Sequence, residues 1–351
     1  MTDVAALAPA AAPDRAGPPV RDIVRRRRSV SLRTVALYLV TLWAVVTVIF
    51  LLPRLLPGDP LQRLDQPDSS TFVYDPVIRA KVAAYYGLDK PLVHQYGSYL
   101  SRLAHGDLGW SISQNLSVSS LIRLRLPWTL LLVGGALLLA AGIGFLAGIT
   151  AAWKRGGVVD RSLIVTLSAA RAIPEYALAS MLLVSFAVFL PLFPQAGAKT
   201  AFAHYPTPFD ALGDVLHHLV LPLVALTLGL AANQFLIVRN SVISTLGEDY
   251  MVLARAKGLP RRLLKYRHSG RNALLPFVTS VGAQVGWAVG PSLFVEVVFA
   301  YPGMGSLLSG AVGARDYPVL QGGFLALAVF VLTVNLILDL TYIRIDPRVG
   351  R

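Results

Sequence analysis

The chain has 351 residues, of which 55% are hydrophobic and only 15% are charged, whereas a water-soluble domain carries about 25% charged residues. The formal net charge is +13, but the Lys and Arg residues separate long apolar runs and form no single basic face, which argues against a soluble nucleic-acid-binding domain. The absence of cysteine excludes a disulfide framework, thiolate metal sites and thiol catalysis. The composition therefore indicates that lipid is the solvent.

The N-terminal segment differs in composition from the rest of the chain. Residues 1–33 are rich in Ala, Pro and Arg and include the basic run Arg25–Arg28. Such a segment cannot bury a core, so we expect a disordered, basic cytoplasmic tail. The apolar run that follows, Thr34–Leu56, is longer than the roughly 7 to 15 residues of a signal-peptide core, and no Ala-x-Ala cleavage site follows it. We interpret this run as an uncleaved first membrane span.

The apolar runs predict the fold class. A helix that crosses about 30 Å of hydrocarbon needs roughly 20 apolar residues. The stretches that meet this requirement are Thr34–Leu56, Trp128–Trp153, Ser162–Leu190, His218–Val238, Leu274–Phe299 and Gln321–Tyr342. The third is interrupted by Arg171, Pro174 and Glu175, which predicts either a kinked helix or a span with an irregular middle. We therefore predict an all-α integral membrane protein whose six transmembrane helices lie within residues 34–351.

The basic residues predict the orientation of these spans. Lys and Arg accumulate in cytoplasmic loops, and here they gather in the tail, at 154–161, at 239–271 and at 344–351. Both termini are therefore expected in the cytoplasm. The external connections are then a long loop at 57–127 and shorter ones at 191–217 and 300–320. Within the long loop, residues 78–103 have a helical pattern with Pro91 inside it, which predicts two short helices.

The cytoplasmic loop 242–272 contains a helix-turn-helix pattern. Residues 252–257 are good helix formers, Gly258 can adopt the left-handed conformation that ends a helix, and Pro260 suits the first turn of the next one. This hairpin is expected to expose a knuckle of small residues, Ala254, Ala256 and Gly258, which another protein could approach closely. The alternative from the residues alone is a basic amphipathic loop that lies on anionic headgroups.

This hairpin resembles the EAA loop of ABC importer permeases. In the segment EDYMVLARAKGLPRRLLKYRHSGRN (248–272), the two alanine positions and the glycine of that loop fall on Leu253, Ala254 and Gly258. Val252 stands at its acidic position, which puts a specific acidic contact to the ATPase in doubt. The dipeptide, oligopeptide and nickel permeases are more similar to this chain, and the matching motifs are Asp249–Tyr250, Ala254–Leu259, Arg271–Pro276, LPGDP at 56–60, YGLDKP at 86–91, GDLG at 106–109, EVVFAYPGMG at 296–305 and DPR at 346–348.

The resemblance implies a division of labour among several subunits. The long external loop is similar to that of the B-type permease, which forms the path for peptides or nickel together with a C-type permease in the bacterial inner membrane. An extracytoplasmic binding protein would deliver the substrate, and two ATPases, or one fused ATPase, would bind ATP and Mg. The chain itself has no G-x-x-x-x-G-K-[ST] phosphate loop, so no catalytic residue, cofactor or metal is expected in it. The residues expected to couple to the ATPase are Asp249, Tyr250, Ala254, Ala256, Gly258, Leu259 and Arg261.

Polar groups inside the spans are candidates for the translocation path, because ionisable groups are costly at membrane depth. The candidates are Glu175, Asn233, Gln234 and Glu296. Each has a structural alternative: Glu175 could pair with Arg171 across one turn at the kink, Asn233 and Gln234 could hold helices together, and Glu296 could be an interfacial carboxylate. Asn233 and Gln234 are adjacent, so at most one of them can point into the path.

Two further motifs were weighed as sites. His217 and His218 could suggest a metal, but adjacent side chains on a helix diverge by about 100°, which disfavours a shared ion. The glycines at 142, 144 and 148 predict close helix packing, and the seam with a second permease is one place for it.

Two other functional classes were considered for the whole chain. A secondary active transporter would work without an ATPase partner and would show paired broken helices. A membrane enzyme would need a polar catalytic cluster, and the sequence has no Ser, His and Asp constellation and no HExxH motif. The permease subunit is therefore the preferred hypothesis.

Overall fold

The computed structural model describes residues 32–55, 80, 83–84 and 89–345, and this part of the chain is a bundle of helices. The elements are α1 (Leu32–Leu55), α3 (Leu92–Ala104), α4 (Val118–Trp153), α5 (Val158–Ala172), α6 (Glu175–Leu183), the π-helical η3 (Val184–Phe189), α7 (Pro208–Leu246), α8 (Asp249–Ala256), the π-helical η4 (Leu263–Gly270), α9 (Arg271–Val298), α10 (Met304–Ala314) and α11 (Tyr317–Ile345). The predicted tail lies outside the described residues except at 32–33, and so do the motifs at 56–60, 86–88 and 346–348.

The described helices confirm the all-α membrane fold. Five of them are long and apolar enough to cross a bilayer, namely α1, α4, α7, η4 with α9, and α11. The bent pair formed by α5 and by α6 with η3 makes six if it counts as one span.

The third span is broken, with an angle of 99° between its halves. Ile173 is extended, with φ −89° and ψ 126°, and Pro174 follows with ψ 140°. A residue before proline avoids the helical region, so α5 ends at Ala172 and a new helix begins at Glu175. The pairing of Arg171 with Glu175 across one helical turn, considered from the sequence, therefore does not form.

Helices α4 and α7 begin ten residues earlier than predicted, at Val118 and Pro208 instead of residues 128 and 218. The apolar pattern missed these polar first turns, which are fixed by caps. Thr207 and Asp210 form a reciprocal capping box around Pro208, an arrangement that satisfies the first amide groups of a helix. With 39 residues and a rise of about 1.5 Å per residue, α7 is about 58 Å long and extends well beyond the roughly 30 Å hydrocarbon layer.

The core lies between α4, α6, α7 and α9, where small residues allow close approach. A β-carbon on Gly148 would lie 2.8 Å from Val238 Cβ, and one on Gly144 would overlap Gln234. The close packing predicted for Gly144 and Gly148 is thus confirmed, but it joins α4 to α7 of the same chain and not two permeases. Gly142 has no atom within 4 Å of its β-carbon position.

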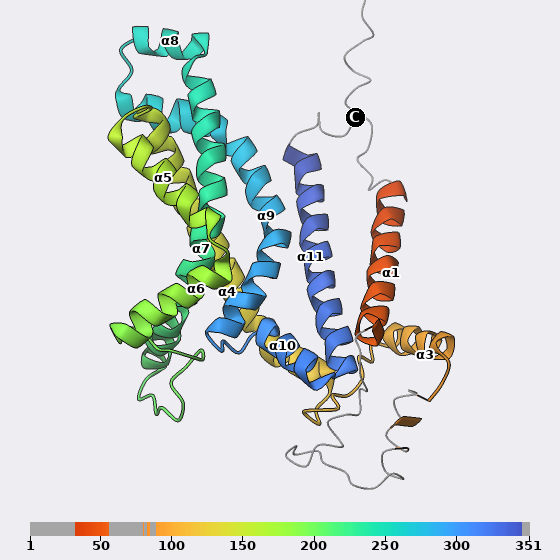
Figure 1. Cartoon of the computed structure of the whole chain (residues 1–351). Coiled ribbons are helices and arrows are strands. Elements are labelled where there is room, and N and C mark those ends of the chain that lie inside the picture. The colour runs from red at the N-terminus through yellow and green to blue at the C-terminus, as the bar shows by residue number, and fades with distance from the viewer. Residues whose placement is uncertain (1–31, 56–79, 81–82, 85–88, 346–351) are drawn as a thin grey trace, which may run out of the picture.

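The remaining helices define the two ends of the bundle (Figure 1). Helix α1 packs beside α11 through Val46, Phe50 and Leu325, and α3 lies across the foot of α1. Helix α8 lies at the opposite end, together with the first residues of α1 and the last residues of α11. Helix α10, near the foot of the bundle, was not predicted. Of the two short helices predicted for 78–103, α3 is confirmed, and most of the other lies outside the described residues.

Candidate functional site: the α8 hairpin and the polar positions between the spans

The α8 hairpin closes as its sequence predicts. Gly258 has a φ of +70°, a left-handed conformation that residues with a β-carbon rarely adopt. Its amide donates to Arg255 O at 2.9 Å, and the Leu259 amide donates to Ala254 O at 3.4 Å. The next helical turn begins at Pro260, whose carbonyl accepts from the Leu263 amide at 2.9 Å. The hairpin is therefore held by backbone geometry and depends on this glycine.

One face of α8 packs against the rest of the chain, and the other is free. Met251 and Ala254 are buried against Leu264, in a cluster that also includes Trp153. The prediction that Ala254 belongs to the exposed knuckle is wrong, because residues 251 and 254 lie one turn apart on the inner face. The exposed side is formed by Val252 (58% exposed) and Leu253 (56% exposed), with Ala256 and Gly258 beyond them.

The other residues expected to couple to an ATPase lie around this face. Asp249 and Tyr250 begin α8 and are exposed, Arg261 is exposed after the turn, and Leu259 is half-buried in the cluster beneath α8. Burial of part of its ring raises the pKa of Tyr250 above the ordinary value, with Glu248 adding to the effect. The Tyr250 hydroxyl therefore stays protonated at neutral pH and accepts a hydrogen bond from Asn272 Nδ2.

The hairpin is tied to three spans. Only two residues separate α8 from the end of α7, and η4 continues directly into α9. The contact between Tyr250 and Asn272 joins α8 to α9, and Lys265 Nζ donates to Thr150 Oγ1 of α4 at 3.2 Å. A displacement of α8 would therefore move the ends of α4, α7 and α9 together.

An ion pair near the same end joins α5 to α7. Arg239 donates from Nε to Asp160 Oδ1 at 2.7 Å and from Nη2 to Asp160 Oδ2 at 2.8 Å, and the Gly156 amide donates to Asp160 Oδ2 at 2.8 Å. Asp160 is 2% exposed, so this bidentate pair fixes the start of the broken span against α7. Sequence reasoning missed it because the partners are 79 positions apart, and no local pattern connects them.

Two of the four predicted path residues, Glu175 at the start of α6 and Asn233 of α7, lie along one face of α7. A β-carbon on Gly229 would lie 3.0 Å from Glu175 Oε1, and Asn233 follows Gly229 by one turn, with its Nδ2 3.4 Å from Ser280 Oγ of α9. Glu175 and Asn233 are both half-buried. They therefore form a partly accessible polar strip between α6, α7 and α9, at the break in the third span.

Gln234 lies in a closed position instead. It is fully buried, its Nε2 donates to Gln284 Oε1 at 2.7 Å, and Gln284 Nε2 donates to Leu230 O at 3.2 Å. These contacts hold α7 to α9, which is the helix-joining role weighed for such amides. As expected for adjacent positions, Asn233 and Gln234 point to different neighbours.

Glu296 is also closed off, in the segment that contains the EVVFAYPGMG motif. It is fully buried, and its Oε2 accepts from the Gly305 amide at 2.6 Å. A β-carbon on Gly303 would overlap the carboxylate, and the Met304 amide donates to Thr129 Oγ1 at 2.8 Å. The motif is therefore a clamp that locks the start of α10 onto α9 and α4, and Glu296 lines no open surface of this chain.

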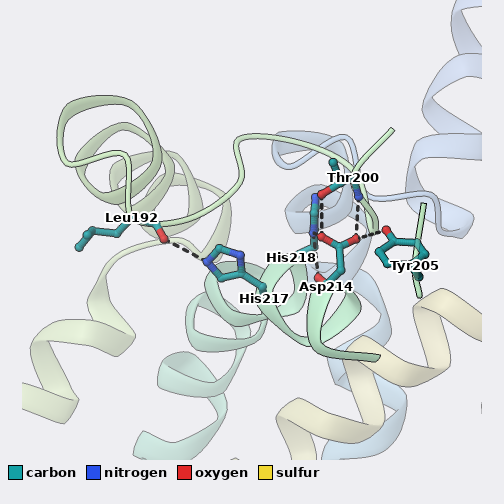
Figure 2. A network of polar contacts seen from close by, with 6 residues as sticks. All are labelled: Leu192, Thr200, Tyr205, Asp214, His217 and His218. Carbon is teal, nitrogen blue, oxygen red and sulfur yellow. Dashed lines mark hydrogen bonds and ion pairs between the residues drawn. The ribbon is translucent and has the colours of Figure 1, made fainter. Parts of the chain in front are cut away.

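The two histidines point apart (Figure 2). His217 Nε2 donates to Leu192 O at 3.0 Å, whereas His218 Nδ1 donates to Asp214 O at 2.9 Å. The Asp214 carboxylate accepts from the Thr200 amide and hydroxyl and from Tyr205 OH, and this hydrogen bond raises the pKa of Tyr205. Within the described residues no group of three or more His, Cys, Asp or Glu side chains could hold a metal ion. The network orders the loop between η3 and α7.

Comparison with known proteins shows the family of this chain. The family of binding-protein-dependent transport system inner membrane components matches residues 144–351. The chain belongs to this family. A Brucella suis protein that carries a peptide-permease name is 39% identical over 310 residues, which are 88% of this chain and 94% of the relative.

Two further relatives have more specific names. The di/tripeptide transport system permease DppB of Pseudomonas aeruginosa is 35% identical over 331 residues, with 90% of this chain and 97% of the relative covered. The glutathione transport system permease GsiC of Escherichia coli K12 is 34% identical over 309 residues, with 88% of this chain and 94% of the relative covered.

The chain is therefore a permease subunit of an ABC importer, a component of a transport system. This family assignment does not favour the secondary transporter that was considered as the alternative. The family and the apolar helices also indicate that the chain spans the bacterial inner membrane several times.

Proposed function

We propose that this chain is the B-type permease of a peptide importer and that α8 docks on a cytoplasmic ATPase. The observation that carries the proposal is the exposed apolar side of α8, Val252 and Leu253, which projects beyond the spans at one end of the bundle. Apolar side chains outside the bilayer are typical of a protein interface. The relatives named for peptides and glutathione support a peptide as the substrate.

The positive-inside rule supports placing the α8 end in the cytoplasm. The basic residues at 255–271 lie in this hairpin, and both ends of the described chain lie at the same side. We propose that the basic side chains of this hairpin also contact anionic lipid headgroups at the bilayer surface, the alternative that the sequence offered. Residues 1–33 are proposed to extend into the cytoplasm as a tail, and residues 34–351 to form the transmembrane domain, with an external loop at 57–127 and the coupling loop at 242–272.

The proposed mechanism uses the connections of the hairpin. ATP and Mg would bind to the ATPase subunits, either two chains or one fused chain, and their closure would displace α8. Because α8 is tied to α4, α7 and α9, these helices would move as near-rigid bodies and switch the side on which the path is open. We propose that Glu175 and Asn233 contribute to this path, which a second, C-type permease completes and an extracytoplasmic binding protein supplies.

The experiment uses the absence of native cysteine. Leu253→Cys on the exposed side of α8 is compared with Ala254→Cys on its buried side, in inverted and in right-side-out membrane vesicles. We expect a membrane-impermeant maleimide to label only the exposed cysteine, and only in inverted vesicles. Co-expressed ATPase should protect that cysteine and co-purify with the chain.

Labelling of Leu253→Cys in right-side-out vesicles would refute the proposed orientation. Full labelling in the presence of the ATPase, with no ATPase in the purified complex, would refute docking through α8. Uptake without ATP by the reconstituted chain alone would contradict the proposed division of labour between permease and ATPase subunits.

A further inference from the structure

A polar cavity lies at the end of the bundle away from α8, and its lining includes the GDLG motif at 106–109, to which no role has been assigned above. Its volume is about 300 Å³. Four separate segments line it: α3, the turn at 106–110, the start of α4 and the start of α11. The lining residues used below are Tyr99, Arg102, Asp107, Trp110 and Gln321.

Two buried polar groups in the cavity wall have no partner. Tyr99 is 8% exposed and Gln321 is 6% exposed, and within the described part of the chain neither Tyr99 OH nor Gln321 Nε2 makes a hydrogen bond. Leaving a buried polar group without a hydrogen bond is energetically unfavourable. Burial raises the pKa of Tyr99 to about 12, so its hydroxyl stays protonated. Both groups can therefore donate to a ligand.

The charge in and around the cavity favours an anion. Arg102 is exposed in the lining. Arg54 lies outside the lining but interacts electrostatically with Tyr99, and within the described part of the chain its guanidinium donates to the neutral Gln95 Oε1 and Phe50 O. Among the described residues of the lining, Asp107 is the one carboxylate, and its Oδ1 already accepts from the Gly109 amide at 2.8 Å. The start of α4 adds the positive end of a helix dipole.

The walls of the cavity are fixed without a ligand. Asp316 at the start of α11 is fully buried and accepts from Ser111 Oγ at 2.6 Å and from the Ser113 amide at 2.9 Å. The Val118 amide donates to Gly109 O at 3.0 Å. These contacts hold the turn against α4 and α11, so an anion would enter a preorganised site and little conformational entropy would be lost.

The surroundings place the cavity at a membrane surface. Helix α3 lies across the foot of α1 (Figure 1) and exposes Leu92 and Val93, which are 55% and 80% exposed, while α1 exposes Trp43 above it. Trp110 at the rim is 43% exposed, and tryptophan is typical of the level of the headgroups. We propose that this cavity binds the phosphate group of an anionic phospholipid, with Tyr99, Arg102 and Gln321 as donors and the acyl chains against α1 and α3.

The test is to measure thermal unfolding of the full-length chain in nanodiscs of phosphatidylcholine, with and without phosphatidylglycerol, and to count retained lipids by native mass spectrometry. We expect phosphatidylglycerol to raise the midpoint of the wild type and to remain bound. Arg102→Gln should weaken its binding about tenfold, as expected for loss of one charge-assisted hydrogen bond. Gln321→Leu should lose the increment from phosphatidylglycerol, whatever its midpoint in phosphatidylcholine.

The control is Arg123→Gln, which removes one exposed arginine from α4 outside the lining of the cavity. It should keep the wild-type response, which separates this site from a general attraction of the cationic chain to anionic lipid. An equal loss in the control, or an unchanged increment in both cavity variants, would overturn the proposal. Inorganic phosphate added to phosphatidylcholine discs tests the source of the group, and stabilisation by it alone would overturn the assignment to a lipid.

Discussion

Replacement of Gly258 tests whether the α8 hairpin depends on a left-handed residue. Its φ is +70°, and no atom lies within 4 Å of its β-carbon position. A side chain would therefore meet no neighbour, and the cost would arise from the backbone alone, about 1–2 kcal/mol. The open form of the hairpin should then become about 5- to 30-fold more populated. Because the position is open, Gly258→Ala and Gly258→Leu should have the same effect on opening.

Hydrogen exchange followed by mass spectrometry over residues 249–265 measures this opening. Both variants should speed exchange of the amides at 258 and 259, which close the turn, and should reduce recovery of ATPase in the purified complex. Gly258→Asn is the matched control, since asparagine tolerates the left-handed region, and it should stay near the wild type. Exchange at the wild-type rate in Gly258→Ala would refute the backbone argument. Normal uptake by Gly258→Leu would remove the coupling role of the hairpin.

Three further substitutions test the packing that surrounds these sites, each by the midpoint of thermal unfolding in detergent. Gly148→Ala should destabilise the chain by about 1–3 kcal/mol through overlap with α7, whereas Gly142→Ala should not. Equal midpoints for the two variants would contradict the close packing of α4 against α7. Gly303→Ala should destabilise the clamp to a similar extent, with Gly313→Ala, which has open space around it, as its control. Asp160→Asn should cost about 2 kcal/mol because it removes the charge-assisted hydrogen bonds of the half-buried Arg239, and a wild-type midpoint would show that the pair is dispensable.

The fold positions the hairpin so that its movement must reach the spans. Helix α7 extends without interruption from the loop that contains Asp214 to the base of α8, so it is the longest rigid element between the two ends. The polar strip at Glu175 and Asn233 lies along this helix, where α6 begins. Under the proposed mechanism, a displacement of α8 would be transmitted along α7 to the break of the third span.

The polar candidates show why the sequence alone does not separate path residues from polar residues that are buried within the chain. The sequence predicted Glu175, Gln234 and Glu296 as path residues for the same reason, which is the free-energy cost of a polar group at membrane depth. That cost is removed equally well by a water-filled path and by a buried hydrogen bond. Only the packing shows that Gln234 is bonded to Gln284 and Glu296 to the Gly305 amide, while Glu175 keeps partial exposure.

The sequence by itself determined the properties that depend on composition and local pattern. These are the membrane class, the order of the spans, an interruption of the third span at Pro174 and the turn at Gly258, because each follows from hydrophobicity or from the allowed backbone angles of one residue. Whether that interruption is a kink or a break was left open by the sequence and decided by the structure. The tertiary structure alone decided which face of α8 is free, which helices Gly144 and Gly148 join, and that Asp160 meets Arg239. These features depend on contacts between segments far apart in the chain, and no local pattern encodes which surfaces meet.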